Sequence, residues 1–252
     1  MAGKNRSAGS RVSLRQAGSG ARKQGVENEI LLKLPRSEFK TAFSRMEFST
    51  LPSRTVLAEH GKPIENCYFL NNGVASIIHV MTDGRSIEVG LTGREGFIGL
   101  PVIVGFQVSP TRAVIQIEAS GYKISAARLQ EVLQTCPALN KILQRYSQEL
   151  SIQSIQIAAC NRLHTVHQQL ARWLLMSHDR VGEFTFLLTQ EFISHMLGTR
   201  RASVSAAAAV LQKSGLITYT RGRVTIKDRA GLERTSCECY GEICKQLRAW
   251  GV

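Results

Sequence analysis

Between about residues 51 and 124, β-branched and apolar residues come in short runs separated by glycine. Segments such as VASIIHVM and AVIQIEA have the alternating character of strands, and TDGRS between two apolar runs is typical of a hairpin turn. The glycines that interrupt the region are Gly61, Gly73, Gly84, Gly93, Gly96 and Gly99. The pattern predicts an antiparallel β-barrel or roll.

The spacing of apolar positions becomes helical in the middle of the chain. From Pro137 to Asn161 there is no glycine and no further proline, and a seam recurs every three or four residues. The seam consists of Cys136, Leu139, Leu143, Tyr146, Leu150, Gln153, Ile157 and Cys160. We expect this central helix to pair with a second copy of itself, with Leu139, Leu143, Tyr146, Leu150, Gln153 and Ile157 in the dimer interface. The alternative is a single amphipathic helix lying on its own β-roll.

The remaining pattern predicts a winged helix-turn-helix. A second helix, HTVHQQLARWLLMSHDR, carries Leu170, Trp173 and Leu174 on one face, and VGEF then turns the chain into a last domain. This domain contains a short strand TFLL, two helices, and a hairpin formed by LITYT and VTIKD around the turn RGR. Two helices joined by a turn and followed by a two-stranded wing are typical of DNA-binding proteins.

The two helices of this domain have clear boundaries in the sequence. Thr189 is a suitable N-cap for the first, in which Phe192, Ile193, Met196 and Leu197 face inward, and Gly198 ends it. The small Ser194 allows close approach of the second helix, which we expect from about Arg201 to Lys213, with Val204, Ala208 and Leu211 buried and Gly215 past its end.

The exposed side of the second helix carries the candidate DNA contacts. Arg200 and Arg201 stand at its start, where arginine can bind guanine bidentately or hold a phosphate, and Ser203 and Ser205 are short hydrogen-bonding side chains. The alternative is that the arginines are solvated surface charges. The predicted DNA-binding set is Thr189, Gln190, Arg200, Arg201, Ser203, Ser205, Arg221 and Arg223, with Lys227 adding to the basic wing.

Charge and composition support a nucleic-acid partner. The formal charge is +13, with 43% hydrophobic residues, enough for a folded core. Six positive charges and no acidic residue lie in the first 26 residues, and from Arg180 onward the sequence has eleven Lys and Arg but only six acidic residues. Such an excess of positive charge suits a polyanion such as DNA.

We divide the chain into a basic disordered arm (1–27), a β-roll sensor domain (28–135), the central dimerisation helix (136–161), the winged helix-turn-helix (162–235) and a Cys-containing C-terminal tail (236–252).

No segment approaches the roughly 18 apolar residues that span a bilayer, and the N-terminus lacks the apolar core of a secretion signal. We therefore expect a cytoplasmic protein with no membrane contact, whose six cysteines are reduced.

Over roughly residues 36 to 235 the sequence resembles the Crp/Fnr family of bacterial transcription regulators. The resemblance lies in HGKPIENCYFLNNGVASII, in DGRSIEVGLTGREGFIG and in the stretch from Leu188 to Ile217. It implies an α+β protein with a cyclic-nucleotide-binding-like β-roll (a double-stranded β-helix), a long dimerisation helix and a winged helix-turn-helix. It also implies a homodimer that binds double-stranded DNA at a pseudo-palindromic operator, contacts RNA polymerase and responds to a small-molecule or redox effector.

The sequence departs from this family at the effector site and on the DNA-reading helix. In IGLP, Leu100 follows Gly99 where nucleotide-binding members have glutamate, and Arg112 lies near, but displaced from, their phosphate-binding arginine. Gly99 and Arg112 are therefore candidates for an effector site, while bound cyclic nucleotide is not expected. Ala202 and Ala206 replace polar residues of the best-known members, so the operator sequence does not carry over.

Cysteine and histidine positions leave several interpretations open. No cysteine precedes Cys67, so the N-terminal iron–sulfur centre of oxygen-sensing members is not expected. Cys237, Cys239 and Cys244 suggest a thiolate metal site, a thiol redox sensor or ordinary reduced cysteines, but they lack a fourth ligand nearby in the sequence. His164 and His167, three residues apart, are interpreted as polar surface or capping groups on one helical face.

The predicted function is therefore sequence-specific regulation of transcription by a non-enzymatic dimer. The alternative is a ligand-, metal- or thiol-redox-sensing module whose DNA contacts are secondary. A third possibility is a metal-dependent barrel enzyme, which needs a paired His-x-His with a further carboxylate and histidine inside the barrel. The roll offers only His60 and His79, far apart in the sequence.

Overall fold

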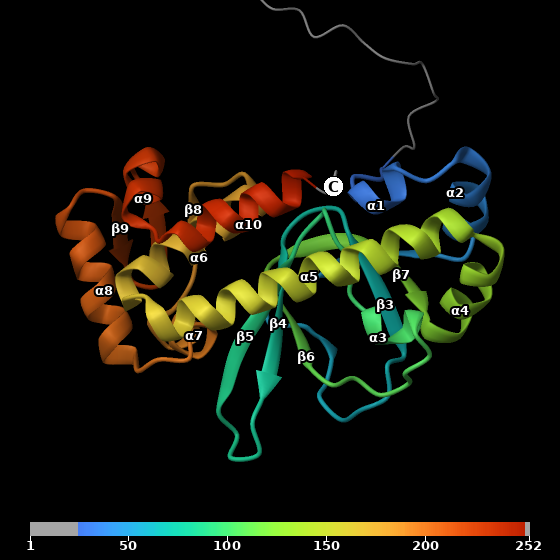
Figure 1. The fold of residues 1–252 in the computed structure, drawn as a ribbon, viewed down its shortest axis with the longest axis horizontal. Coiled ribbons are helices and arrows are strands. Elements are labelled where there is room, and N and C mark those ends of the chain that lie inside the picture. The colour runs from blue at the N-terminus through green and yellow to red at the C-terminus, as the bar shows by residue number, and fades with distance from the viewer. Residues whose placement is uncertain (1–24, 250–252) are drawn as a thin grey trace, which may run out of the picture.

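A computed structural model describes residues 25–249 (Figure 1). The N-terminal half contains α1 (Glu29–Leu32), α2 (Arg36–Phe43), β1 (Glu47–Leu51), β2 (Val56–Ala58), β3 (Asn66–Leu70), β4 (Val74–Val80), β5 (Ser86–Thr92), α3 (Leu100–Ile103), β6 (Arg112–Ile117), β7 (Ala119–Ser125) and α4 (Ala126–Thr135). The C-terminal half contains α5 (Pro137–Leu163), α6 (Val166–Val181), β8 (Thr185–Leu187), α7 (Gln190–Met196), α8 (Arg201–Lys213), β9 (Ile217–Thr220), β10 (Arg223–Ile226), α9 (Arg229–Thr235) and α10 (Glu238–Ala249).

The predicted β-roll is present and consists of two antiparallel sheets. One sheet has the strand order β1-β7-β3 and the other β2-β6-β4-β5. The TDGRS hairpin joins β4 to β5 and projects from the roll, with Gly84 in the left-handed region that its turn requires (Figure 1). The chain is thus an α+β protein in which the roll lies in the N-terminal half and the long helices α5 and α6 follow it.

The start of the described chain lies against this roll. Most of the predicted basic arm, residues 1–24, is outside the described residues. Residues 25–27, which the prediction included in the arm, contact the roll instead: Val26 is buried, and the Gly25 carbonyl accepts a hydrogen bond from Asn71 Nδ2 at 2.8 Å.

The long helix α5 joins the roll to the C-terminal domain across the front of the view in Figure 1. Pro137 occupies its first turn, where a missing N–H costs nothing, and the Glu38 carboxylate accepts hydrogen bonds from the backbone N–H groups of Ala138 and Leu139. No helix among the described residues has the length and apolar composition needed to cross a lipid bilayer.

The predicted dimer seam of α5 is turned inward, which corrects the interface assignment. Leu139, Leu143, Tyr146, Gln153 and Ile157 are all buried within a single chain, and Leu150 is half-buried against Gly90 of β5. The Gln153 side-chain oxygen accepts a hydrogen bond from the Leu91 N–H at 2.7 Å, and the Tyr146 and Thr92 hydroxyls lie 2.8 Å apart. The stripe is apolar because the helix packs on its own roll, which was the alternative interpretation of the same spacing.

Helix α6 forms the centre of the C-terminal domain and also contacts the roll. Trp173 is fully buried, and its indole N–H donates a hydrogen bond to Glu88 of β5 at 2.9 Å. Burial raises the pKa of Glu88 to about 7, and hydrogen bonding from Ser76 and the charge of Arg172 only partly offset this effect. A buried carboxyl therefore links the two halves of the molecule.

The segment predicted as a C-terminal tail is a helix. α10 runs back alongside α5 and contacts it near its C-terminal end (Figure 1). Cys237 and Cys239, at the start of α10, are buried with Cys160 of α5 in a small separate cluster. Residues 236–249 are thus part of the folded C-terminal half.

Candidate nucleic-acid interface

Helices α7 and α8 form the predicted helix-turn-helix. The Thr189 hydroxyl caps α7 by accepting a hydrogen bond from the Phe192 N–H at 3.1 Å, and Gly198 has the positive φ of +60° that ends the helix. Ile193, Met196 and Leu197 of the first helix are buried, as are Val204, Ala208 and Leu211 of α8. The inward-facing residues predicted from the sequence are confirmed for both helices, except that Phe192 is only half-buried.

A three-stranded sheet with the order β8-β10-β9 completes the winged domain. Arg221 and Gly222 both have positive φ, the conformation of a tight hairpin turn, and they place the wing tip beside the start of α7. The Tyr219 hydroxyl donates a hydrogen bond to the Leu188 carbonyl at 2.7 Å and holds the wing to that segment.

The predicted DNA-binding residues lie at the surface of this domain. Arg200 is the N-cap of α8 and Arg201 its first residue, and both are exposed. Gln190 Nε2 reaches Ser205 Oγ at 3.5 Å, so these two predicted contacts lie side by side across the helix pair. The rest of the predicted set is also exposed or half-buried: Thr189, Ser203, Arg221 and Arg223.

The start of α8 also faces the β4–β5 hairpin of the roll. A common hollow of about 1330 Å³ is lined by Arg200 and Ser203 and by the hairpin residues Met81 and 83–87. Gly198 approaches Ile87 so closely that an added Cβ would lie 2.6 Å from the Ile87 Cδ1. The roll therefore contacts the winged domain directly at the turn between α7 and α8.

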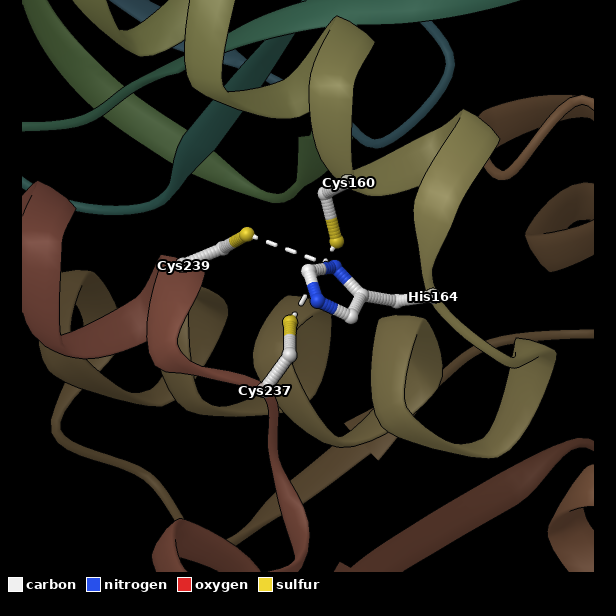
Figure 2. Close-up of side chains that lie close together, drawn as sticks. All are labelled: Cys160, His164, Cys237 and Cys239. Atoms are coloured by element: carbon white, nitrogen blue, oxygen red, sulfur yellow. Dashed lines mark hydrogen bonds between the residues drawn. The ribbon is translucent and has the colours of Figure 1, made fainter.

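A second cluster of reactive side chains lies where α5 meets α10. Cys160, His164, Cys237 and Cys239 converge there, drawn from two segments more than 70 residues apart (Figure 2). Among the described residues this is the one group of three or more potential metal ligands. The partners missing from the C-terminal cysteine motif are thus upstream, and Cys244 is not part of the group.

The cluster alters the assignments of both histidines. His164 is the C-cap of α5, whereas His167 belongs to α6, so the two do not share a helical face. The sequence could have indicated that His164 lies near Cys160, because a spacing of four residues places both side chains on one side of a helix.

The electrostatics of the cluster favour a thiolate at Cys160. A hydrogen bond from Cys237 lowers the pKa of the Cys160 thiol, and the nearby Arg172 and His164 act in the same direction. Cys239 has a raised pKa because it is buried, and the pKa of His164 is raised chiefly by its hydrogen bond to Cys160.

Comparison with known families and structures identifies the architecture. The family described as "Crp-like helix-turn-helix domain" matches residues 168–235, and the "Cyclic nucleotide-binding domain" family matches residues 48–136. Together these matches cover more than half of the chain. The chain belongs to the Crp/Fnr family of transcriptional regulators.

Solved structures of Crp/Fnr regulators share the fold at low sequence identity. A regulator from Eubacterium rectale aligns with a TM-score of 0.65 at 15% identity over 82% of this chain and 97% of its own. FixK2 from Bradyrhizobium japonicum aligns with a TM-score of 0.65 at 15% identity, over 76% of this chain and 98% of its own. CLP from Xanthomonas campestris, described as responsive to c-di-GMP, aligns with a TM-score of 0.64 at 17% identity, over 77% of this chain and 100% of its own. No curated protein sequence matches the chain significantly.

The effector region of this Crp/Fnr protein differs from the nucleotide site that the family resemblance implies. Gly99 packs on Cys67, and Leu100 begins α3 where a ribose-binding glutamate is expected. Two hollows adjoin Leu100: one of about 60 Å³, which Gly99 also lines, and a more open one of about 550 Å³ bounded by apolar side chains such as Val104 and Phe106. Arg112 forms an ion pair with Glu59 at 3.3 Å, so the two predicted effector residues do not share a built anion site.

The roll also brings His60 and His79 together, with ring centroids 6.5 Å apart. Both are exposed on its surface, and no third potential ligand groups with them in the described part of the chain. The pair therefore does not form the three-ligand centre of a barrel enzyme.

Proposed function

We propose that this Crp/Fnr protein is a homodimeric, sequence-specific DNA-binding regulator in which Arg201 reads a base and Arg200 holds a phosphate. The observation that carries this proposal is the first turn of α8. Two exposed arginines stand there at the entry to the helix, in the same domain as the basic wing. The positive end of the helix dipole and the arginines would act together on a phosphate or a guanine.

The proposed homodimer forms through the outer face of α5, since the inner face is covered by the roll. Ser151, Ile155, Ala158 and Ala159 lie on this outer face and are exposed, and Ile155 is 66% exposed. Small residues around a central isoleucine allow two helices to approach closely, and a two-fold axis there would present two copies of α8.

The effector is proposed to be something other than a cyclic nucleotide held in the roll, since Leu100 stands where a ribose-binding glutamate is expected and Arg112 is paired with Glu59. The contact of Ile87 with the turn at Gly198 provides a route from the roll to the DNA-reading helix. A change in the position of the β4–β5 hairpin would alter the surroundings of Arg200 and Ser203 directly.

Selection of bound fragments from the source genome tests this function. We expect full-length protein to enrich fragments that share an inverted repeat, with half-sites separated by about one or more helical turns of 10–10.5 bp. Enrichment no greater than that of random fragments, in low and physiological salt alike, would contradict the proposal.

A further inference from the structure

The cluster at the end of α5 has the dimensions of a mononuclear metal site. The ligand atoms of Cys160, His164, Cys237 and Cys239 all lie within 4.8 Å of one another. The Cys160 and Cys237 sulfurs are 3.4 Å apart, and Cys239 Sγ lies 3.5 Å from His164 Nδ1. A tetrahedral zinc site with ordinary bond lengths requires separations of about 3.5–3.8 Å, so each pair needs to move by no more than about 1 Å.

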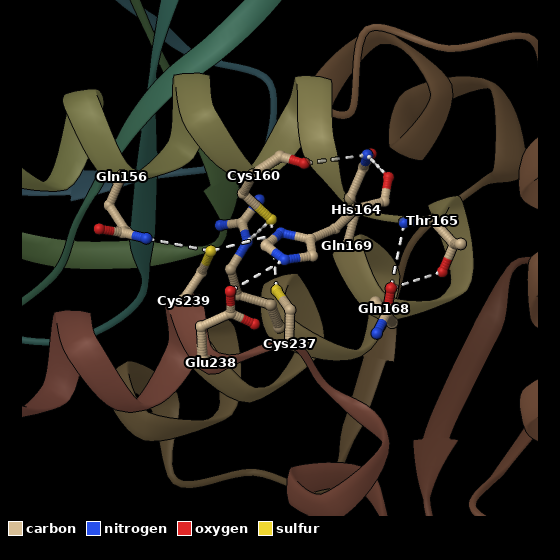
Figure 3. Close-up of polar contacts among 10 residues, drawn as sticks. Gln156, Cys160, His164, Thr165, Gln168, Gln169, Cys237, Glu238 and Cys239 are labelled. Atoms are coloured by element: carbon tan, nitrogen blue, oxygen red, sulfur yellow. Dashed lines mark hydrogen bonds and ion pairs between the residues drawn. The ribbon is translucent and has the colours of Figure 1, made fainter.

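The ligands are oriented by neighbouring polar groups, as in metal sites generally (Figure 3). His164 Nδ1 faces the sulfurs, while its Nε2 lies 3.1 Å from Glu238 Oε1, an arrangement that fixes the ring for coordination through Nδ1. Gln156 Nε2 donates a hydrogen bond to Cys239 Sγ at 3.0 Å. A reduced cysteine pair alone needs neither the histidine nor its carboxylate partner.

The charge around the cluster also fits a bound ion. Arg172 is 1% exposed, and its Nε donates a hydrogen bond to Cys160 Sγ at 3.3 Å. None of the ion pairs within residues 25–249 includes this guanidinium. Three thiolates and one divalent cation leave a net charge of −1, which the buried Arg172 would balance.

We propose that Cys160, His164, Cys237 and Cys239 bind one zinc ion that fastens α10 to the C-terminal end of α5. Three thiolates from buried cysteines and the imidazole of a half-buried histidine form a closed set typical of structural zinc, with no open position for a substrate. The ion would lie beside the link between α5 and α6, where the chain passes from the roll and its helix into the DNA-binding domain.

Cobalt uptake by the full-length, tag-free protein tests the site. The chain is reduced, freed of metal with a chelator and titrated with Co²⁺ alone, while visible absorption is recorded. We expect saturation at one ion per chain, with the intense d–d bands and the thiolate charge-transfer band of a tetrahedral site, and displacement of cobalt by Zn²⁺. Protein expressed in zinc-supplemented medium should contain one zinc per chain by mass spectrometry.

Substitutions assign the ligands. Cys239→Ser and His164→Gln should each abolish or shift the cobalt bands, and Glu238→Gln should weaken metal affinity roughly 10- to 100-fold at unchanged stoichiometry. Cys244→Ser is the matched control, since Cys244 lies on the same helix outside the group, and it should leave the titration unchanged.

The proposal is overturned if the reduced wild-type chain, folded by circular dichroism, takes up no stoichiometric cobalt or zinc. It is also overturned if Cys244→Ser removes the bands, or if the purified chain contains a Cys160–Cys237 disulfide and binds no metal after reduction. The wild-type measurement needs no variant to fold. It also uses no DNA, so its failure would be separate from a failure of DNA binding.

Discussion

At the scale of single residues, the buried Glu88 makes stability depend on pH. Its carboxyl has a pKa of about 7 in the folded protein because burial disfavours the charged form, against an ordinary value near 4.5 in the unfolded chain. The folded state thus binds more protons than the unfolded state between these values. The contribution of Glu88 to the free energy of unfolding is therefore greatest below pH 4.5, and it is lost as the pH rises to about 7.

The substitution Glu88→Gln removes this titration while keeping an oxygen that can accept the Trp173 hydrogen bond. We expect the variant to gain stability relative to wild type by up to about 3 kcal/mol as the pH rises from 5 to 8. Urea unfolding of both proteins at the two pH values measures the difference. Glu149 also has a pKa raised to about 7, mainly by burial, so the comparison with wild type is what isolates Glu88. The same difference at both pH values would refute the assignment.

At the scale of secondary-structure elements, α5 shows what helical periodicity can and cannot establish. The seam from Leu139 to Ile157 correctly predicts a helix with one buried face. Periodicity does not say which partner covers that face, because a β-roll and a second helix both accept an apolar stripe. The polar Gln153 binds a strand backbone at Leu91, a contact that no helix spacing encodes.

The outer face of α5 makes the proposed dimer testable with Ile155→Lys. Burying an isoleucine contributes about 2 kcal/mol, and two-fold symmetry changes both copies, so we expect dimer affinity to fall by roughly a thousand-fold. Sedimentation velocity over a concentration series measures this change. Val210→Lys is the control: this valine of α8 is also exposed, at 48%, but lies on another helix. Equal dimer affinity in the two variants would place the interface elsewhere.

The helix-turn-helix was the most predictable element. Its cap at Thr189, its turn at Gly198 and its buried Val204 are local features, since each depends on backbone conformation or spacing within one helix pair. The cysteine cluster was not predictable in this way. Cys160 and Cys237 come together only because α10 folds back on α5, and neither segment alone contains a complete ligand set.

At the scale of the whole molecule, the roll, α5 and the winged domain are connected by contacts at several points. Glu88 of the roll binds Trp173 of α6, and Ile87 packs on the turn at Gly198, so adjacent residues of β5 contact both the centre of the DNA-binding domain and its DNA-reading edge. These contacts form a short physical path from the roll to α8.

If this molecule reads DNA sequence through Arg201, loss of that side chain must weaken specific binding most. The most direct test measures the DNA affinity of Arg201→Ala on a selected operator and on random DNA, at several salt concentrations. Lys213→Ala is the control, because it removes a positive charge at the opposite end of α8. We predict that Arg201→Ala costs about 1 to 3 kcal/mol on the operator and much less on random DNA, while Lys213→Ala changes both little. An equal loss on both DNAs would reduce Arg201 to a phosphate contact, and a wild-type protein that does not distinguish operator from random DNA would contradict the account.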